Sequence, residues 1–238
     1  MPRFVALCLL MTALLGCSSV PESVGPKPEV KTIALVPPAL PLDYQFYNLR
    51  AVQAALFGVA SIPLGLLDES NKDRVKRFAL SMPAPDFRID VELTESIVRS
   101  LRSMGYEVTI LSNLKRDPTD PENVDIEKVP HTADAVVHAY FRDTGVQSPR
   151  MKTDFYPRVS VNLVSFVPKG KAPAKYSTLY YGLDAVPGRG DSIPAEVKYV
   201  YPNYEFIMSN IPMLRTNFTV AANQLGGLVA QHLHSRFR

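Results

Sequence analysis

Cysteine is almost missing from this sequence. Among its 238 residues only Cys8 and Cys17 carry a thiol, and both lie close to the first residue. Beyond residue 17 the chain has no thiol that attacks a substrate, binds zinc or forms a disulfide. Thiol catalysis, cysteine-bound zinc and a disulfide framework are therefore excluded for the main part of the chain.

An excess of charge of one sign is also lacking. The 26 basic residues nearly balance the 23 acidic ones, and the formal net charge is only +3. Because nucleic-acid binding depends on a strongly basic surface, we expect no nucleic-acid partner. With 46% hydrophobic residues the chain can bury a core, and its 21 prolines disfavour a mainly helical bundle.

The common signatures of catalysis are missing as well. The four histidines are not part of an HExxH motif, and no GxSxG, SxxK or phosphate-binding glycine loop is present. We therefore expect no enzyme activity, no cofactor and no metal site. The alternative is a hydrolase of another kind that uses polar residues such as Asp43, Asp143 or Asp154.

The first residues, by contrast, carry an export signal. Arg3 is followed by an uncharged run from Phe4 to Leu15 and then by Gly16 and Cys17. A basic start, a short apolar stretch and a small residue before the cleavage point are typical of a secretion signal. A membrane-spanning helix needs about 20 apolar residues, and this run ends too early to span.

Leu14-Leu15-Gly16-Cys17 closely resembles the lipobox of bacterial lipoproteins. In that family the signal is cleaved before the cysteine, the thiol is diacylated and the new amino terminus is acylated. The resemblance implies a signal peptide over 1–16 and acyl chains such as palmitate on Cys17, which would hold the protein on a membrane. The alternative is an ordinary cleaved signal with a chance cysteine.

The residues after Cys17 indicate where the protein goes. Ser18 follows the cysteine, and in Gram-negative lipoproteins a residue other than Asp there usually permits export. The resemblance therefore implies the cell outer membrane, with the domain facing the periplasm. Residues 17–30 include three prolines and predict a stiff lipidated tether that reaches about 40 Å when extended.

Periodicity predicts the first part of the folded domain. Residues 32–36 form a short apolar run typical of a buried strand. Residues 90–104 place apolar side chains on one helical face, and Gly105 stands where a helix cap belongs. A β-rich run over 106–111 follows, so we expect two parallel strands joined by a helical crossover.

The second part of the domain reads as strands followed by a helix. Residues 135–146 predict a strand, and 158–167 and 175–183 flank a polar, glycine-containing connection typical of a hairpin. The last helix is expected over 218–236, with Asn217 as its N-cap. Gly226 and Gly227 either weaken this helix or allow close packing.

This order resembles the small α/β domain of bacterial envelope lipoproteins, such as the curli-secretion lipoprotein and the lipoprotein that activates a peptidoglycan synthase. The likeness lies in the strand 32–36, the helix end Ser103-Met104-Gly105-Tyr106 and the segment Ala133–Val137. It implies an α/β (α+β) fold with a mixed sheet of about five strands in the order βαββββα. Two helices would pack on the sheet of a single domain over 31–238, with long loop insertions at about 39–85 and 184–215.

The insertion 39–85 contains an apolar stretch, 51–67, next to a basic cluster. An apolar run beside basic residues can lie on an anionic membrane surface or cover a lipid pocket. The alternative is a helix packed on the domain with a solvated basic flank. The candidate membrane or lipid contacts are Leu56, Phe57, Leu64 and Leu66.

The insertion 184–215 is rich in aromatic residues, which supply large contact areas at protein interfaces. The candidate partner surface consists of Tyr199, Tyr201, Tyr204 and Phe206. A loop that its own rings pin to the core is the alternative.

These features predict a membrane-anchored lipoprotein that acts as a binding, assembly or regulatory subunit of a cell-envelope complex. Its partners would be the bacterial membrane, through the acyl chains, and either an envelope protein or a second copy of the chain. The alternative function is a carrier of a lipid or small amphiphile that uses the apolar insertion 51–67.

Overall fold

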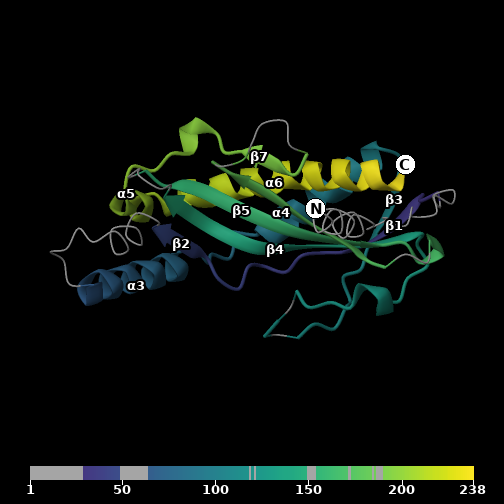
Figure 1. Ribbon diagram of the computed structural model, residues 1–238, viewed down its shortest axis with the longest axis horizontal. Helices are drawn as coiled ribbons and strands as arrows, with labels where there is room; N and C mark the ends of the chain where they lie inside the picture. Colours follow the sequence, from purple (N-terminus) through teal and green to yellow (C-terminus); the bar gives the residue numbers. More distant parts are fainter. Residues whose placement is uncertain are drawn as a thin grey trace, which may run out of the picture.

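Figure 1 shows the computed structural model, which describes residues 29–48, 64–117, 119–120, 122–148, 154–170, 173–183, 185 and 190–238. In these ranges seven strands form one mixed sheet, in the order β3-β1-β4-β5-β6-β7 with β2 also paired to β4. The strands are β1 (Thr32–Val36), β2 (Gln45–Asn48), β3 (Glu107–Ile110), β4 (Ala135–Ser148), β5 (Tyr156–Phe166), β6 (Lys175–Gly182) and β7 (Ser192–Pro194). The α+β class is as the sequence predicts.

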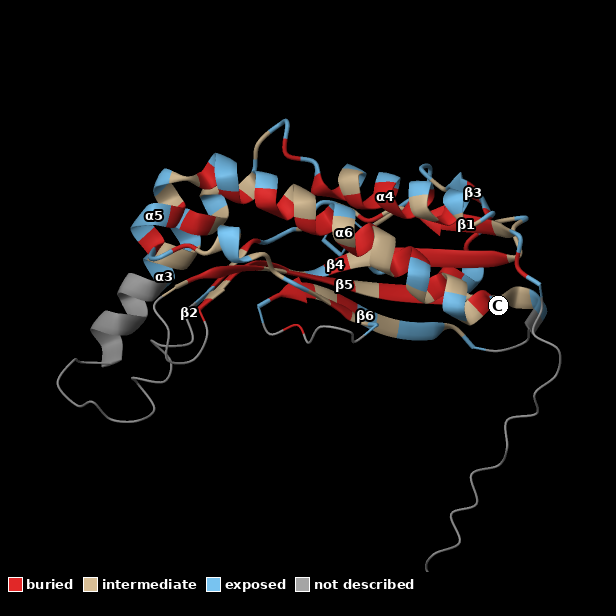
Figure 2. Ribbon diagram, turned by 90° about the horizontal axis from the view of Figure 1, so that it is seen from above, coloured by how far each residue is buried: buried red, intermediate tan, exposed pale blue. Residues whose placement is uncertain are grey.

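Helices cover one face of the sheet (Figure 2). The two long helices α4 and α6 lie against each other, and α6 also contacts β5 and β6. The α-helices of the described ranges are α3 (Leu64–Ser81), α4 (Ile89–Ser103), α5 (Tyr204–Ser209) and α6 (Ile211–Phe237). None of these helices combines the length and the apolar content that a membrane crossing requires.

The predicted crossover from β1 through α4 to β3 is confirmed, and β1 and β3 are parallel. The apolar face of α4 is completely buried at Leu93, Ile97 and Leu101. Gly105 follows the helix with φ of 92°, a conformation that side chains with a Cβ rarely adopt. The chain therefore leaves α4 and enters β3 within a few residues.

The predicted antiparallel half of the sheet is also confirmed. β4 pairs with β5, and β5 pairs with β6 as a hairpin. The register between β4 and β5 shifts between Phe141 and Asp143, which marks a β-bulge. The order of the elements expected from the sequence is thus present, with further elements inserted.

The expected count of about five strands is wrong, because each long insertion adds one strand. β2 lies in the insertion 39–85 and pairs in parallel with Gly145–Ser148, while β1 pairs with Ala135–His138. The chain from β1 to β2 therefore follows one edge of the long strand β4. Gly145 makes this possible, since a Cβ there would lie 1.9 Å from the Gln45 carbonyl oxygen.

The second insertion is a folded segment and not a long loop. It contains β7, the helix α5 and the first residues of α6. Asn203 caps the short helix α5, because its side-chain oxygen accepts the Phe206 backbone N–H at 2.8 Å. The aromatic residues of this segment are therefore divided between the core and the surface.

The last helix begins earlier than predicted, so the assignment of Asn217 as its N-cap is wrong. α6 starts at Ile211, with Pro212 in its first turn, where proline fits a helix. Asn217 lies inside the helix and is fully buried. Its side-chain amide donates to the Tyr201 hydroxyl at 3.2 Å.

The main core lies between the sheet and the helices, and a smaller core lies on the opposite face of the sheet. The smaller core is built from strand residues such as Val36 and Val136 and from Ile126 and Val129. The described part of the segment 111–133, which includes the short 3₁₀ helix Ile126–Lys128, therefore covers this face of the sheet near β1. Further along β4, β5 and β6, this face of the sheet carries polar and aromatic side chains.

Candidate functional site

Part of the sheet surface opposite the helices carries no described helix, and we call it the helix-free face. Strand alternation places its side chains, because neighbours across an antiparallel pair share a face. Asn162 pairs with Tyr140 and Thr178, and Ser160 pairs with Tyr180. The helix-free face consists of Tyr47, Tyr140, Arg158, Asn162, Tyr176, Thr178 and Tyr180.

Part of this face is exposed, and polar contacts join several of its side chains. Tyr176 is 72% exposed and Tyr47 is 38% exposed. Thr178 donates from Oγ1 to Asn162 Oδ1 at 2.8 Å, and Arg158 places its guanidinium carbon 6.0 Å from the centre of the Tyr180 ring. Arg158 also donates to Gln147 at 2.6 Å. The face thus presents fixed rings and hydrogen-bonding groups to whatever contacts it.

Two of the three aspartates proposed for a hydrolase lie near this face. Burial raises the pKa of Tyr47, and the negative charge of Asp143 adds to the shift, with a smaller effect from Asp43. Asp143 lies 3.8 Å from Arg142. Asp154 is half-buried, and the described residues show no hydrogen bond that joins it to the other two. Asp143 and Asp43 are thus the two of the three candidates whose charges act on Tyr47.

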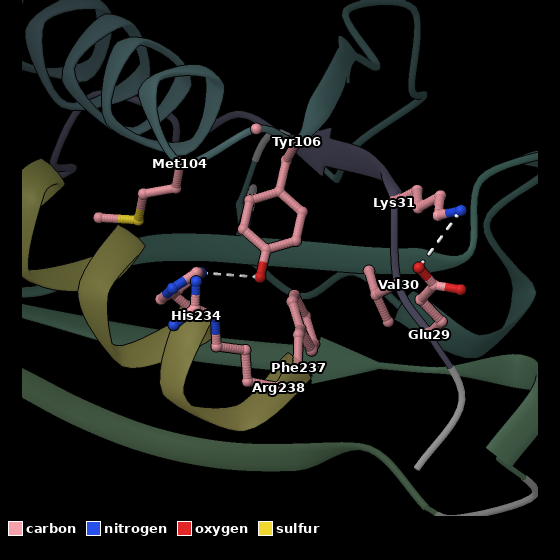
Figure 3. A pocket seen from close by; sticks show the side chains of 9 residues that line it. Glu29, Val30, Lys31, Met104, Tyr106, His234, Phe237 and Arg238 are labelled. Atoms are coloured by element: carbon pink, nitrogen blue, oxygen red, sulfur yellow. Dashed lines mark hydrogen bonds and ion pairs between the residues drawn. The ribbon is translucent and has the colours of Figure 1, made fainter. Parts of the chain in front are cut away.

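A second feature is a hollow of about 370 Å³ at the opposite end of β1 from β2 (Figure 3). The start of the described chain, the turn after α4 and the last turn of α6 line it, and it is open to solvent. The lining residues are Glu29, Val30, Lys31, Met104, Gly105, Tyr106, His234, Phe237 and Arg238.

A ring cluster forms the inner wall of the hollow. The Tyr106 hydroxyl and His234 Nδ1 are 3.0 Å apart, and the rings of Tyr106 and His234 meet edge to face at 5.7 Å. Phe237 meets Tyr106 in the same way at 6.2 Å. Burial raises the pKa of Tyr106, and the positive charge of Arg238 opposes that shift. The wall is therefore apolar with a single polar pair.

Asp134 fixes the chain where it enters the fold beside this hollow. Its Oδ2 accepts the backbone N–H groups of Lys31 and Thr32 and the Thr32 hydroxyl, at 2.9–3.1 Å. Its Oδ1 accepts Lys169 Nζ at 2.8 Å. The hydrogen bond from Lys169, followed by those from Lys31 and Thr32, holds the pKa of Asp134 far below its usual range. The start of the described chain is thus tied to the sheet.

The structure corrects the partner surface expected from the second insertion. Tyr201 is fully buried and Tyr204 is 8% exposed, so neither ring is available to a partner. Tyr204 packs edge to face on Phe46, 5.1 Å between ring centres, and its hydroxyl donates to the Arg74 carbonyl. Only Tyr199, which is half-buried, and Phe206, which is 40% exposed, reach the surface.

The remaining candidate residues cannot be placed fully. Cys17, Leu56 and Phe57 lie outside the described residues. Leu64 and Leu66 belong to α3, but their side chains are not among those described. The expectation of membrane or lipid contact therefore stays a prediction.

Sequence reasoning missed a polar cluster under the end of α6. The Ser177 hydroxyl lies 3.1 Å from His232 Nε2, and Arg236 donates to Ser177 and, at 3.4 Å, to Ser165. Burial lowers the pKa of His232, and Arg236 lowers it further. Since the guanidinium and the imidazole hold the same serine hydroxyl, the cluster ties α6 to β5 and β6. The partners are too far apart in the sequence for a spacing motif to reveal them.

No family model matches the sequence, and no curated protein matches it. Solved structures that are similar to this chain include the following three. Lipoprotein GNA1162 from Neisseria meningitidis is 14% identical, with a TM-score of 0.29 over 63% of this chain and 82% of that chain. Protein XCC0632 from Xanthomonas campestris, of the DUF330 family, is 9% identical, with a TM-score of 0.33 over 91% and 93%. The hypothetical protein CT253 from Chlamydia trachomatis is 12% identical, with a TM-score of 0.29 over 84% and 98%. Identities and scores this low transfer no activity and no partner.

Proposed function

We propose that this chain is a lipid-anchored protein of the bacterial outer membrane that faces the periplasm and binds a protein partner of the cell envelope. In this role it acts as a binding, assembly or regulatory subunit. The observation that carries the proposal is the lipobox-like Leu14-Leu15-Gly16-Cys17, followed by a proline-containing tether that leads to the first described residues. Acyl chains hold a protein at a membrane when two or more insert together.

The helix-free face supports the binding role. Two of its tyrosines, Tyr47 and Tyr176, are exposed, and Tyr140, Tyr180 and Arg158 are half-buried on the same face. Tyrosine and arginine are enriched at protein interfaces, because a ring or a guanidinium adds contact area and hydrogen bonds together. This face replaces the buried Tyr201 and Tyr204 as the proposed partner surface.

We infer binding and not catalysis from the residues that the chain offers. The sequence has no recognised nucleophile, metal or phosphate motif. Among the described residues, no three His, Cys, Asp or Glu side chains are placed to hold a metal ion. A role in placing or regulating another protein fits these side chains better than a reaction does.

Site-specific photo-crosslinking in intact cells tests this proposal. A photoreactive amino acid replaces Tyr176, which is 72% exposed on the helix-free face, or Val197, which is 85% exposed outside that face. We expect a discrete crosslinked species from position 176 and none from position 197. A species of twice the mass would identify a second copy as the partner. Uncrosslinked monomer at both positions would contradict the proposal.

The carrier of a lipid or small amphiphile is the second candidate. The hollow beside Tyr106, of about 370 Å³, lies within the size range of small-molecule sites, which is about 300–1,000 Å³. Mass spectrometry of an organic extract of the purified protein tests this function. A stoichiometric amphiphile would support a carrier, and an extract free of such a molecule would contradict it.

A further inference from the structure

We propose that the first part of β6, residues 175–179, binds an extended, acidic segment of a protein partner by strand addition. The inference rests on the proposed function, in which the chain binds a protein of the cell envelope. It goes further by naming the element that is contacted, the conformation of the partner segment and the charge of that segment.

One side of β6 is open along most of its length. β5 pairs with residues 175–181 on one side, whereas β7 pairs only with residues 180–182 on the other side. In the described part of the chain, no strand pairs with 175–179 on the side of β7, and we call this stretch the open edge. Figure 2 shows β6 at the margin of the sheet, with exposed residues in pale blue.

The hydrogen bonds of β6 show which backbone groups face the open edge. The Tyr180 N–H donates to the Asp191 carbonyl at 3.0 Å and therefore points away from β5. Because backbone direction alternates along a strand, the N–H and C=O groups of Tyr176 and Thr178 point the same way. Among the described residues, no hydrogen bond reaches these outward groups. They are therefore available to the backbone of an added strand.

Other edges of the sheet are protected against such pairing. At β3, the N–H groups of Glu107 and Leu111 point toward β1, so the Val108 carbonyl faces outward. This carbonyl accepts a hydrogen bond from Arg102 at 3.1 Å. β7 is only three residues long and ends in Pro194, which has no N–H. The open edge has no comparable protection for its outward backbone groups in the described structure.

Two cations lie at the start of the open edge. Lys175 and Ser177 share the face of the sheet that the helices cover, because they alternate with Tyr176. Lys175 is exposed and forms no ion pair with a described residue. Arg236 donates to Ser177, and burial lowers its pKa with no carboxylate opposing the shift. A side chain of an added strand that faces the helices here meets both charges, which favours Asp or Glu at that position.

The protein's own residues do not supply this acidic side chain. Glu127 accepts the Ala174 N–H at 3.4 Å, just before the open edge. Asp191 lies beside Tyr180, beyond the opposite end, and already has an interaction partner. A second copy that paired through its own open edge would offer no carboxylate, because 175–179 contain neither Asp nor Glu. The charges therefore favour an acidic segment of a different protein.

Photo-crosslinking from position 176 in intact cells tests the open edge when a second substitution is added. Thr178→Pro removes an outward N–H and leaves the ladder to β5 intact, because that N–H takes no part in the ladder. Thr178→Val is the matched control, since it also loses the hydroxyl that donates to Asn162 but keeps the N–H. Lys175→Glu reverses the charge at the open edge, and Lys198→Glu reverses an exposed charge elsewhere.

We expect Thr178→Pro to lower the yield of the crosslinked species at least about tenfold, because a backbone hydrogen bond is lost and the ring blocks the added strand. Lys175→Glu should lower the yield about fivefold, and both controls should leave it unchanged. Mass spectrometry of the crosslinked peptide should show an acidic residue next to the crosslinked position. Circular dichroism checks the fold of Thr178→Pro, and the exposed Lys175 variant decides the question if the proline variant is unfolded.

The outcomes separate this inference from the function on which it rests. A crosslink that persists in both Thr178→Pro and Lys175→Glu overturns the open edge and leaves partner binding standing. A crosslinked segment without acidic residues, or a second copy of the chain, also overturns the inference and leaves binding through this side of the sheet. If position 176 gives no crosslink without a second substitution, the proposed function and the open edge are contradicted together.

Discussion

At the scale of single residues, Asp134 has the most consequential contacts in the described chain. One carboxylate receives two backbone N–H groups, a hydroxyl and the Lys169 ammonium. Hydrogen bonds to the charged form of a carboxylate favour that form and lower its pKa. The residue therefore links the start of β1, the start of β4 and the turn after β5 only while it is ionised.

We expect Asp134→Asn to lower the melting temperature at neutral pH, because the amide cannot accept all of these hydrogen bonds. The folded-state pKa of Asp134 lies below its unfolded value of about 3.9, so its contribution is fully present above that pH. It is lost as the pH falls through the folded-state pKa. Thermal melts should therefore show a smaller difference in melting temperature between Asp134→Asn and the parent protein at pH about 3 than at neutral pH.

Asp125→Asn is the matched control for this prediction. Asp125 pairs with Lys128 at 2.6 Å, but its side chain is 52% exposed and holds no distant segment. Surface pairs of this kind contribute little to stability. The role given to Asp134 would be contradicted if both variants lowered the melting temperature equally. It would also be contradicted if the effect of Asp134→Asn grew in acid.

The sequence pattern predicted the structural role of some residues and missed that of others, and the difference has a physical reason. Gly105 was predictable, because the end of an apolar helical face demands a residue that tolerates positive φ. The burial of Tyr201 and Tyr204 was not predictable, because an aromatic ring fits a protein core and a protein interface equally well. Only the packing against Phe46 and Asn217 decides between the two.

At the scale of elements, the close contact between α4 and α6 holds the helical layer together. Gly226 faces Ser96 so closely that a Cβ would lie 2.5 Å from the Ser96 Cβ. Ser96 donates from Oγ to the Asn223 carbonyl at 2.6 Å, which joins the two helices at the same point. The sequence left open whether the glycines of α6 weaken the helix or allow close packing. The structure shows that Gly226 allows close packing with α4.

We expect Gly226→Ala to destabilise the protein by about 1–3 kcal/mol, because α4 or α6 must move to admit the methyl group. For a chain of this size the melting temperature should fall by about 2–12 °C. Gly227→Ala is the matched control, since its nearest neighbour is Ser100 Oγ at 3.9 Å. That change should stabilise the helix by up to about 1 kcal/mol. Equal effects of the two substitutions in thermal melts would show that the helix contact is not the cause.

The elements that the sequence predicted are those with a strong period. The face of α4 and the apolar runs of β1, β4, β5 and β6 each repeat often enough to identify their structure. β2 and β7 have four and three residues, too few for a period, and their pairing partners are distant in the sequence. The predicted start of α6 is late because Asn217 was assigned as the N-cap, whereas Pro212, which is well suited to a first turn, lies at the true start.

At the scale of the whole molecule, neither candidate site could be read from local sequence. Residues from three separate parts of the chain line the hollow, and the helix-free face needs the registers of β2, β4, β5 and β6. The sequence instead offers the anchor, because a lipobox is a local motif. The proposed anchor is thus a local feature of the sequence, whereas the two candidate sites form only when the chain folds.

The anchor gives the prediction with the widest consequence. Cys17→Ala removes the sulfur that the lipobox resemblance implies is acylated, so we expect a precursor that keeps residues 1–16 and carries no acyl chain. Intact mass spectrometry of the membrane and soluble fractions measures both features, and Cys8→Ala, inside the signal, should be processed normally. Normal cleavage and membrane retention of Cys17→Ala would contradict the lipobox assignment. Because the described core begins at Val30, loss of acylation should change where the domain resides while its fold persists.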